Sequence, residues 1–430
     1  MNLVLVGLLC VVVVLLLAEG MGRSGRVVEF PFLAGAAFFA FILPQLPGLA
    51  EDPYLPDGAF ARAMIVTIGC ALACRVGWGM GWTVTPEAAV FSERRLLFAA
   101  AVLSACGAFF FFQFNRLPYE YRTEGLHTGI SVAYLFLGKL LYYGFTIAVL
   151  CLARRVTPAA LAIVLFDSVF YLDRIVISGR RSDAVQFAVA IAVALWFQRR
   201  WAVPRTLALV GLAVGALLLA STGDYRQRTM SRDGPAWNRL ADIAVLDNFQ
   251  KGLADGGQEM RNAILLMERV SRAGNHDLAA YHWNTLVFNY VPAQIVGTRI
   301  KRSLLIDLPE SRERDYSAPT GTTETGMADA YASFGYAGPV KFLLIGLLMG
   351  ALYRGAMAGR TEHQVFYALL VVPAMLTITH HTHWLLSEAV QAVLFVGPFL
   401  LFARIGRAPL PGGRHALMAA EPGMHRAAGS

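Results

Sequence analysis

The sequence predicts an all-α integral membrane protein with about eleven transmembrane helices and one large, partly helical loop. Of its 430 residues, 56% are hydrophobic and only 15% are charged, and the mean hydropathy is +0.52. Soluble globular domains carry roughly 25% charged residues. The apolar residues form long unbroken runs, such as 3–18 and 207–220, that approach the ~20 residues needed to cross a hydrocarbon core. These runs lack the alternation of apolar and polar faces that a soluble core would show.

Eleven apolar stretches define the expected spans. They cover approximately 2–18, 30–49, 60–82, 96–114, 129–153, 159–177, 184–198, 205–221, 337–354, 364–380 and 384–403. The chain is thereby divided into eight helices within 1–221, a loop at 222–336, three helices within 337–404 and a tail at 405–430. We expect the first run to remain as a helix, because it lacks the basic start and small-residue cleavage site of a signal peptide. The Gly-, Pro- and Ala-rich tail is expected to be disordered and cytoplasmic.

The distribution of arginines predicts the orientation. With the N-terminus outside, most arginines fall in inside connections and the tail, including the pairs at 94–95, 154–155 and 199–200. Cytoplasmic loops of membrane proteins are enriched in this way. The bias predicts a multi-pass protein of the bacterial inner membrane whose 222–336 loop lies in the periplasm. No long basic tract is present, so nucleic acid is not an expected partner.

The large loop is expected to carry helices of its own. The stretch 236–254 places apolar side chains near one helical face, and 258–272 does the same. Loops this long usually carry function or their own structure. We see no internal repeat along the chain, which weakens a transporter hypothesis.

Cysteine and histidine supply two candidate metal motifs that we do not favour. Cys70 and Cys74 share a helix face, but apolar surroundings suit them to packing. His380, His381 and His383 form a turn before the last span, without a carboxylate or thiol nearby in sequence to complete a ligand set. Proton transfer or substrate binding by one histidine is the alternative.

Basic residues on the outer side are candidate phosphate ligands, because arginine binds phosphate oxygens in a bidentate fashion. Arg180 and Arg181 lie between two spans, and Arg226 and Arg228 follow the eighth span. Lys301 follows an apolar, aromatic stretch that suits the bilayer surface. The alternative interpretation is that these side chains bind no ligand and are either solvated loop residues or anchors of a helix end.

Acidic residues supply candidate bases. Glu324 and Asp329 precede the ninth span, where partial desolvation raises a carboxyl pKa toward the range of a general base. A helix cap is the alternative for Asp329. Within the spans, we expect Lys139 to pair with Asp167, and Asp173 to orient Arg180 or Arg181.

Four motifs in order resemble the Wzy-type O-antigen or oligosaccharide repeat-unit polymerases, over roughly residues 160–355. The strongest, at 328–338, reads Ala-Asp-Ala-Tyr-Ala-Ser-Phe-Gly-Tyr-Ala-Gly. It is similar to the family's acidic-x-Tyr-x-Asn-Phe-Gly-x-x-Gly, with Asp329 where Glu is commoner and Ser333 where Asn is commoner. The Gly-Arg-Arg turn at 179–181, the Tyr-Arg at 225–226, and Asn-Tyr-Val-Pro followed by Lys301 also resemble the family.

The resemblance implies a glycosyltransferase that acts on undecaprenyl-diphosphate-linked glycans at the outer face of the inner membrane. Arginine and lysine side chains would stabilise the departing diphosphate; the candidates are Arg180, Arg181, Arg226, Arg228 and Lys301. The catalytic base would be Asp329, Glu324 or His282. Tyr331 and Tyr336 would stack on sugar rings. No cofactor and no metal are expected. The partners would be the lipid-linked glycan, membrane lipids and a chain-length regulator.

Three other functions remain open. An O-antigen ligase uses the same donor and the same layout of many spans and a large loop. A transporter or flippase of the lipid-linked glycan is favoured modestly by Lys139, Asp167 and Asp173. A non-catalytic assembly scaffold would tolerate changes at all candidate residues.

Overall fold

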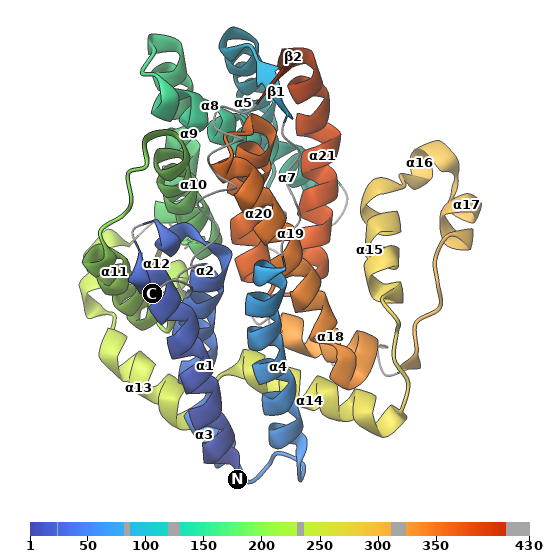
Figure 1. The fold of residues 1–430 in the computed structure, drawn as a ribbon. Helices are drawn as coiled ribbons and strands as arrows, with labels where there is room; N and C mark the ends of the chain where they lie inside the picture. Colours follow the sequence, from blue (N-terminus) through green and yellow to red (C-terminus); the bar gives the residue numbers. More distant parts are fainter. Residues whose placement is uncertain (24, 81–86, 119–129, 230–235, 311–323, 410–430) are drawn as a thin grey trace, which may run out of the picture.

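The computed structural model describes residues 1–23, 25–80, 87–118, 130–229, 236–310 and 324–409. These form a bundle of long helices (Figure 1), with a small two-stranded sheet at one end and shorter helices at the other. We call these the sheet end and the loop end. The first half of the chain contains α1 Asn2–Gly22, η1 Arg26–Val28, α2 Phe30–Ala37, η2 Phe38–Ile42, η3 Leu43–Gln45, α3 Leu46–Ala50, α4 Ala59–Gly79, α5 Glu93–Asn115, α7 Ile130–Gly138, α8 Leu140–Arg154, α9 Pro158–Val176, α10 Arg181–Arg199 and α11 Arg205–Leu219.

The predicted loop is largely helical, and three long helices follow it. Its elements are α12 Thr222–Thr229, η4 Trp237–Asp242, α13 Val245–Asp255, α14 Gln258–Ala273, α15 Ala280–Tyr290, α16 Ala293–Val296, α17 Thr298–Ser303, α18 Gly326–Phe334 and η6 Gly335–Ala337. They are followed by α19 Val340–Met357, α20 Thr361–Leu376 and α21 His383–Ala403. The predicted helix at 258–272 is confirmed as α14, whereas the one at 236–254 is interrupted between η4 and α13.

Seven helical segments of the described chain are long and apolar enough to cross a membrane: α1, Phe30–Ala50, α4, α5, Ile130–Arg154, α19 and α21. The pair α11 and α12, bent by 69°, would be an eighth. The predominantly helical class is therefore confirmed, and the long apolar helices are compatible with a multi-pass membrane protein. Helices α9, α10 and α20 coincide with three further predicted spans, so the count of eleven stays a prediction.

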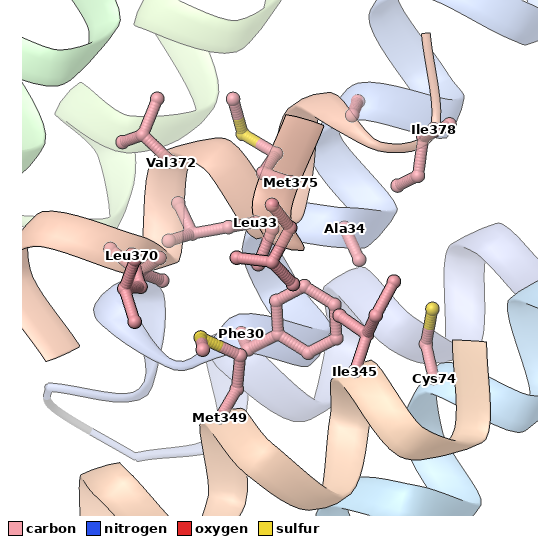
Figure 2. Packing of buried hydrophobic residues seen from close by; sticks show 14 of the residues in the cluster. Phe30, Leu33, Ala34, Cys74, Ile345, Met349, Leu370, Val372, Met375 and Ile378 are labelled. Carbon is pink, nitrogen blue, oxygen red and sulfur yellow. The ribbon is translucent and has the colours of Figure 1, made fainter. Parts of the chain in front are cut away.

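Apolar side chains from four helices form the centre of the bundle. Figure 2 shows Phe30 of α2 packed among Ile345 and Met349 of α19 and near Leu370 of α20. Cys74 of α4 borders the same cluster with no exposed surface, as the packing interpretation predicts. Close packing of this kind fixes where the helix ends lie.

Glycines let α4 and α19 approach each other closely. A Cβ added at Gly77 would lie 2.0 Å from the Leu343 carbonyl oxygen, and one at Gly346 would lie 2.5 Å from the Cys74 carbonyl oxygen. Small residues at such crossings bring helix backbones into contact. This crossing holds the start of α19 against the bundle.

The predicted ion pairs within the spans are wrong in their partners. Lys139 pairs with Glu388 of α21, and Asp167 accepts a hydrogen bond from the Ser104 hydroxyl at 2.7 Å. The expectation for Asp173 also fails. The carboxylate that holds an arginine beside the 178–183 turn is Asp183, whose Oδ2 lies 2.5 Å from the Arg174 Nε. Sequence spacing does not reveal which helices are neighbours, and this decides the partners.

Polar contacts dock α14 on the loop end of the bundle. Arg261 pairs with Asp52, and Glu268 pairs with Arg62 of α4. The Gln45 Oε1 accepts a hydrogen bond at 3.0 Å from the backbone N–H of Met260, in the first turn of α14. The large loop is therefore attached to the bundle at several points along α14.

The tail begins with an ordered strand. Strand β2 (Arg404–Pro409) pairs antiparallel with β1 (Glu87–Phe91) at the sheet end. The predicted disorder from residue 405 therefore does not hold for 405–409. Residues 410–430 lie outside the described part of the chain.

Candidate functional site

Helix α18 places its acidic residue in the interior at the loop end. The helix begins at a capping Thr325, whose hydroxyl accepts from the Ala328 N–H at 3.4 Å. Gly326 lies directly against the turn that follows α20, since a Cβ there would be 1.8 Å from the Thr377 carbonyl oxygen. The 377–382 turn and α18 thus pack face to face.

The start of α15 is bonded to the end of α18. The backbone N–H groups of Asp277 and Leu278 donate to the carbonyl oxygens of Ala332 and Ser333, at 3.1 and 3.3 Å. These bonds bring the first turn of α15 beside the acidic residue of α18.

Asp329 is fully buried yet is surrounded by polar groups. Its Oδ2 accepts from both the backbone N–H and the hydroxyl of Thr382. The Lys341 Nζ lies 3.2 Å from the same oxygen and donates to the Ser333 hydroxyl at 2.8 Å. Lys341 is itself 8% exposed. A buried carboxylate is stabilised only when it is paired and hydrogen-bonded, as here.

His282 meets the same carboxylate from α15. Its Nε2 lies 2.7 Å from the Thr382 Oγ1, 3.3 Å from the Lys341 Nζ and 3.4 Å from the Asp329 Oδ2. One ring nitrogen therefore borders a hydroxyl, an ammonium and a carboxylate. Proton exchange among these groups needs no rearrangement of the backbone.

A second histidine connects Asp329 to Glu324. The His381 Nδ1 lies 3.8 Å from the Asp329 Oδ1, and its Nε2 lies 3.4 Å from the Glu324 Oε2. The ring lies 5.4 Å from Tyr281 and 5.2 Å from His383, between centroids. The side chains of His381 and Glu324 are 13% and 21% exposed, whereas Asp329 has none. Solvent therefore reaches the histidine and Glu324 rather than Asp329.

We call these residues the Asp329 cluster. Its members are His282, Glu324, Asp329, Ser333, Lys341, His381 and Thr382. All three predicted bases, Asp329, Glu324 and His282, are brought together in it.

A second group, the arginine group, lies where α9, α10 and α12 meet. It consists of Arg174, Arg180, Arg181, Arg226 and Arg228. Tyr225 of α12 attaches this helix to the end of α9 by donating to the Val176 carbonyl oxygen at 2.6 Å. Three of the four arginines predicted to bind diphosphate, Arg180, Arg181 and Arg226, are thus brought to one place, and Arg228 follows two residues after Arg226 on α12.

Most of the positive charge in the arginine group is unbalanced. Arg174 pairs with the buried Asp183. Arg181 donates to the Leu219 carbonyl oxygen at 3.2 Å, and Arg226 reaches the Gly179 carbonyl oxygen at 3.4 Å. In the described part of the chain, none of Arg180, Arg181, Arg226 and Arg228 forms an ion pair, and the Arg228 Nη1 is buried without a hydrogen bond.

Burial and mutual repulsion act on these guanidinium groups. Burial lowers the pKa of Arg180, and the neighbouring Arg174 lowers it further. Burial also lowers the pKa of Arg181, as does Arg226, whereas the nearby Glu259 raises it. A bound anion would reverse both effects, because it would neutralise charges that now repel each other in a poorly solvated place.

The 377–382 turn contributes to the Asp329 cluster and lies within electrostatic reach of the arginine group. Thr382 belongs to the Asp329 cluster, and His380 lies two residues earlier. Burial lowers the pKa of His380 to about 4, and the charges of His381 and Arg181 contribute. Arg181 therefore lies close enough to the turn to act on it electrostatically. His380 is neutral at physiological pH and its ring lies 4.3 Å from that of Trp384.

The remaining three predicted site residues differ in how well they are placed for their expected roles. Tyr331 is 4% exposed and packs edge-on between Tyr336 and His276, so its ring faces are covered. Tyr336, 61% exposed, keeps an accessible ring. Lys301 lies on α17, in a hairpin far from α9 and α10 (Figure 1), where its Nζ donates to the Phe288 carbonyl oxygen at 3.0 Å. Sugar stacking by Tyr331 and diphosphate binding by Lys301 alongside the arginines are not supported.

Sequence reasoning missed Lys341 and Arg174. A signal existed for Lys341, since a lysine at the second position of an apolar helix needs a partner, and Asp329 lies twelve residues earlier. Arg174 was not among the candidate phosphate ligands. Within the described ranges, no group of three or more His, Cys, Asp or Glu side chains is placed to hold a metal ion.

No protein-family model, curated protein or solved structure matches this chain. The chemistry must therefore be inferred from the Asp329 cluster and the arginine group themselves. Together they place carboxylate and imidazole groups and a group of arginines at the loop end of the bundle.

Proposed function

We propose that the protein polymerises undecaprenyl-diphosphate-linked oligosaccharide repeat units at the periplasmic face of the bacterial inner membrane. The observation that carries the proposal is that one turn, residues 377–382, lies close to both groups. Thr382 of this turn belongs to the buried Asp329 cluster, whose imidazoles are partly exposed, and the charge of Arg181 acts on His380 of the same turn. A transfer from a lipid diphosphate to a sugar hydroxyl needs both.

The reaction exchanges one bond for another. The bond between the anomeric carbon of the growing glycan and the diphosphate oxygen breaks, and the oxygen leaves with the electron pair. A hydroxyl of the acceptor repeat unit attacks the same carbon, and its proton passes to the base. The products are a glycan longer by one repeat unit and undecaprenyl diphosphate.

The arginine group suits the leaving diphosphate. Its negative charge increases as the bond breaks, and guanidinium groups already fixed in place stabilise it without reorganisation. Arg180 and Arg181 are the best placed, since they are half-buried and Arg181 acts on the turn next to the cluster. No nucleotide is needed, because the donor is linked to a lipid.

Histidine is the better candidate for the base that touches the acceptor. Asp329 has no exposed surface and its Oδ2 is occupied by Thr382 and Lys341, so we assign it a positioning role. His282 and His381 contact it from two sides and retain some exposure. A carboxylate that orients an imidazole and stabilises its protonated form is an arrangement found in hydrolases. Glu324 would act through His381.

The proposal is tested by deleting the gene in its host and separating the surface glycolipids on a gel. Polymerase activity predicts loss of the ladder while a band carrying a single repeat unit remains. Loss of both would identify a ligase or an exporter instead. An unchanged ladder, together with unchanged exopolysaccharide, would refute the proposal.

Point variants in the deletion strain separate an enzyme from a transporter. With Arg180→Ala, an enzyme leaves unreacted lipid-linked repeat units on the outer face, whereas a flippase leaves them inside. A scaffold would restore the wild-type ladder with every variant of the two groups.

A further inference from the structure

A hairpin within the large loop stands beside the bundle. We define the α15–α17 hairpin as residues 280–306. Its two arms are joined near the base, where the Trp283 Nε1 donates to the Leu304 carbonyl oxygen at 2.7 Å. Asn284 exchanges two hydrogen bonds with the backbone of Ile306, at 2.7 and 2.9 Å. Figure 1 shows the hairpin extending from α18 along α21 toward the sheet end.

The far end of α15 contacts helices that are long and apolar enough to span a membrane. The Tyr290 hydroxyl donates to the Ser387 carbonyl oxygen of α21 at 2.6 Å. Its ring lies 5.8 Å from that of Phe136, in the span that runs from Ile130 to Arg154. Ser387 is the fifth residue of α21, so it lies about 6 Å beyond the helix start. The hairpin therefore extends past the level at which α21 begins.

Several side chains that the hairpin exposes at this level are large and apolar. Phe288 is 70% exposed, Ile295 82% and Ile300 56%. These fractions are similar to that of Val14 in the candidate membrane span α1, which is 59% exposed. Exposure of large apolar side chains to water over such a stretch is unfavourable and marks a covered surface.

Charge and aromatic residues identify what covers it. The hairpin carries Arg299, Lys301 and Arg302 and no acidic residue between 280 and 306. Basic side chains beside an apolar face suit the phosphates of anionic lipids. Trp283 at the hairpin base and Trp384 at the start of α21 are 46% and 42% exposed. Tryptophans cluster at the boundary between membrane and water.

We propose that the α15–α17 hairpin is embedded in the membrane leaflet at the loop end, with its apolar residues among acyl chains. The guanidinium groups of Arg299 and Arg302 then reach toward the phosphates, whereas the Lys301 Nζ is held against Phe288. Helix α21, which the hairpin contacts, also exposes apolar side chains, such as Val393 at 60%. The inference does not depend on the proposed function. It places His282, at the base of α15, at headgroup level.

The test compares the surroundings of three positions in the full chain. Cys10 and Cys106 are replaced by Ser, because the other three cysteines are buried. Single variants Ile295→Cys, Tyr54→Cys and Val14→Cys are labelled with bimane and inserted into nanodiscs of phosphatidylethanolamine and phosphatidylglycerol. Tyr54, 88% exposed between α3 and α4, is the reference for water, and Val14 the reference for lipid. Fluorescence quenching is measured with iodide in solution and with nitroxide on the lipid acyl chain.

The proposal predicts that the label at position 295 behaves as the one at position 14 does. It is quenched by the acyl-chain nitroxide and protected from iodide several-fold relative to position 54. Iodide quenching equal to that at position 54 would overturn the proposal. Protection from both quenchers would also overturn it, because a second copy or another protein would then cover the hairpin. Equal elution volumes of the three variants establish that each is folded.

Discussion

Lys341 joins α18 to α19 through a buried ion pair, so its replacement tests the geometry of the Asp329 cluster. In Lys341→Met the apolar stem is kept and the ammonium is lost. Asp329, with no exposed surface, then keeps the hydrogen bonds of Thr382 but loses its cationic partner. The Ser333 hydroxyl loses a donor as well.

The expected cost follows from that burial. Removal of one partner from a buried pair destabilises a protein by about 3–5 kcal/mol, because a buried charge is left uncompensated. Asp329→Asn removes the other charge. The double variant leaves no uncompensated charge, so its loss of stability is smaller than the sum of the single losses, by a coupling energy on the order of 2–3 kcal/mol.

Stability is measured in mixed micelles by titration with sodium dodecyl sulfate, followed by tryptophan fluorescence. Lys301→Met is the matched control, because this lysine is near the surface and donates to one carbonyl oxygen. We expect it to cost less than about 1 kcal/mol. Equal losses for Lys341→Met and Lys301→Met, or additive losses in the double variant, would refute the ion pair as described.

Three further predictions follow from other parts of the chain. The pKa of His380 is about 4 against an ordinary 6.5, so the unfolded chain binds a proton first and stability falls as pH drops from about 6.5 to 4. This loss, about 3 kcal/mol at most, disappears in His380→Asn in the same titration at several pH values. Arg180→Gln breaks no side-chain hydrogen bond or ion pair of the described chain, so we expect the free energy of unfolding to stay the same while turnover falls about 10²-fold. A polymer ladder identical to that of the wild type would contradict a role of Arg180 in the reaction. Gly77→Ala lowers the free energy of unfolding by about 1–3 kcal/mol, because the new methyl group overpacks against α19. Gly215→Ala does not destabilise the protein, since no atom lies within 4 Å of the new Cβ. Equal thermal unfolding temperatures of the two variants would contradict the close crossing of α4 and α19.

The sequence was sufficient for features that depend on composition and local pattern. Apolar runs identified the helices, and the amphipathic stretch at 258–272 identified α14. The motif at 328–338 gave Asp329, and Glu324 and His282 were the other candidate bases, although the three residues are up to 47 residues apart in the chain. Their meeting around the 377–382 turn required the packing of α18 on α20, which no local pattern encodes.

Ion-pair partners on different helices of the bundle could not be predicted from the sequence. Lys139 pairs with Glu388 and not with Asp167 because α21 lies beside it, although Glu388 is 249 residues away in the chain. The pairing of Arg174 with Asp183 depends on the bend between α9 and α10. Tyr331 fits a sugar-binding motif in sequence, yet the turn from α18 to α19 buries its ring. Neighbour relations of this kind follow from tertiary packing alone.

The most direct test of the central claim uses purified protein in liposomes with its undecaprenyl-diphosphate-linked repeat unit, isolated from the deletion strain. We expect the wild type to produce lipid-linked dimers and longer chains, and Asp329→Asn, which keeps the side chain's shape, to produce none. Chains of equal length from both proteins would contradict the assignment of the site. Transfer only to a lipid A core, without lipid-linked dimers, would contradict polymerisation itself.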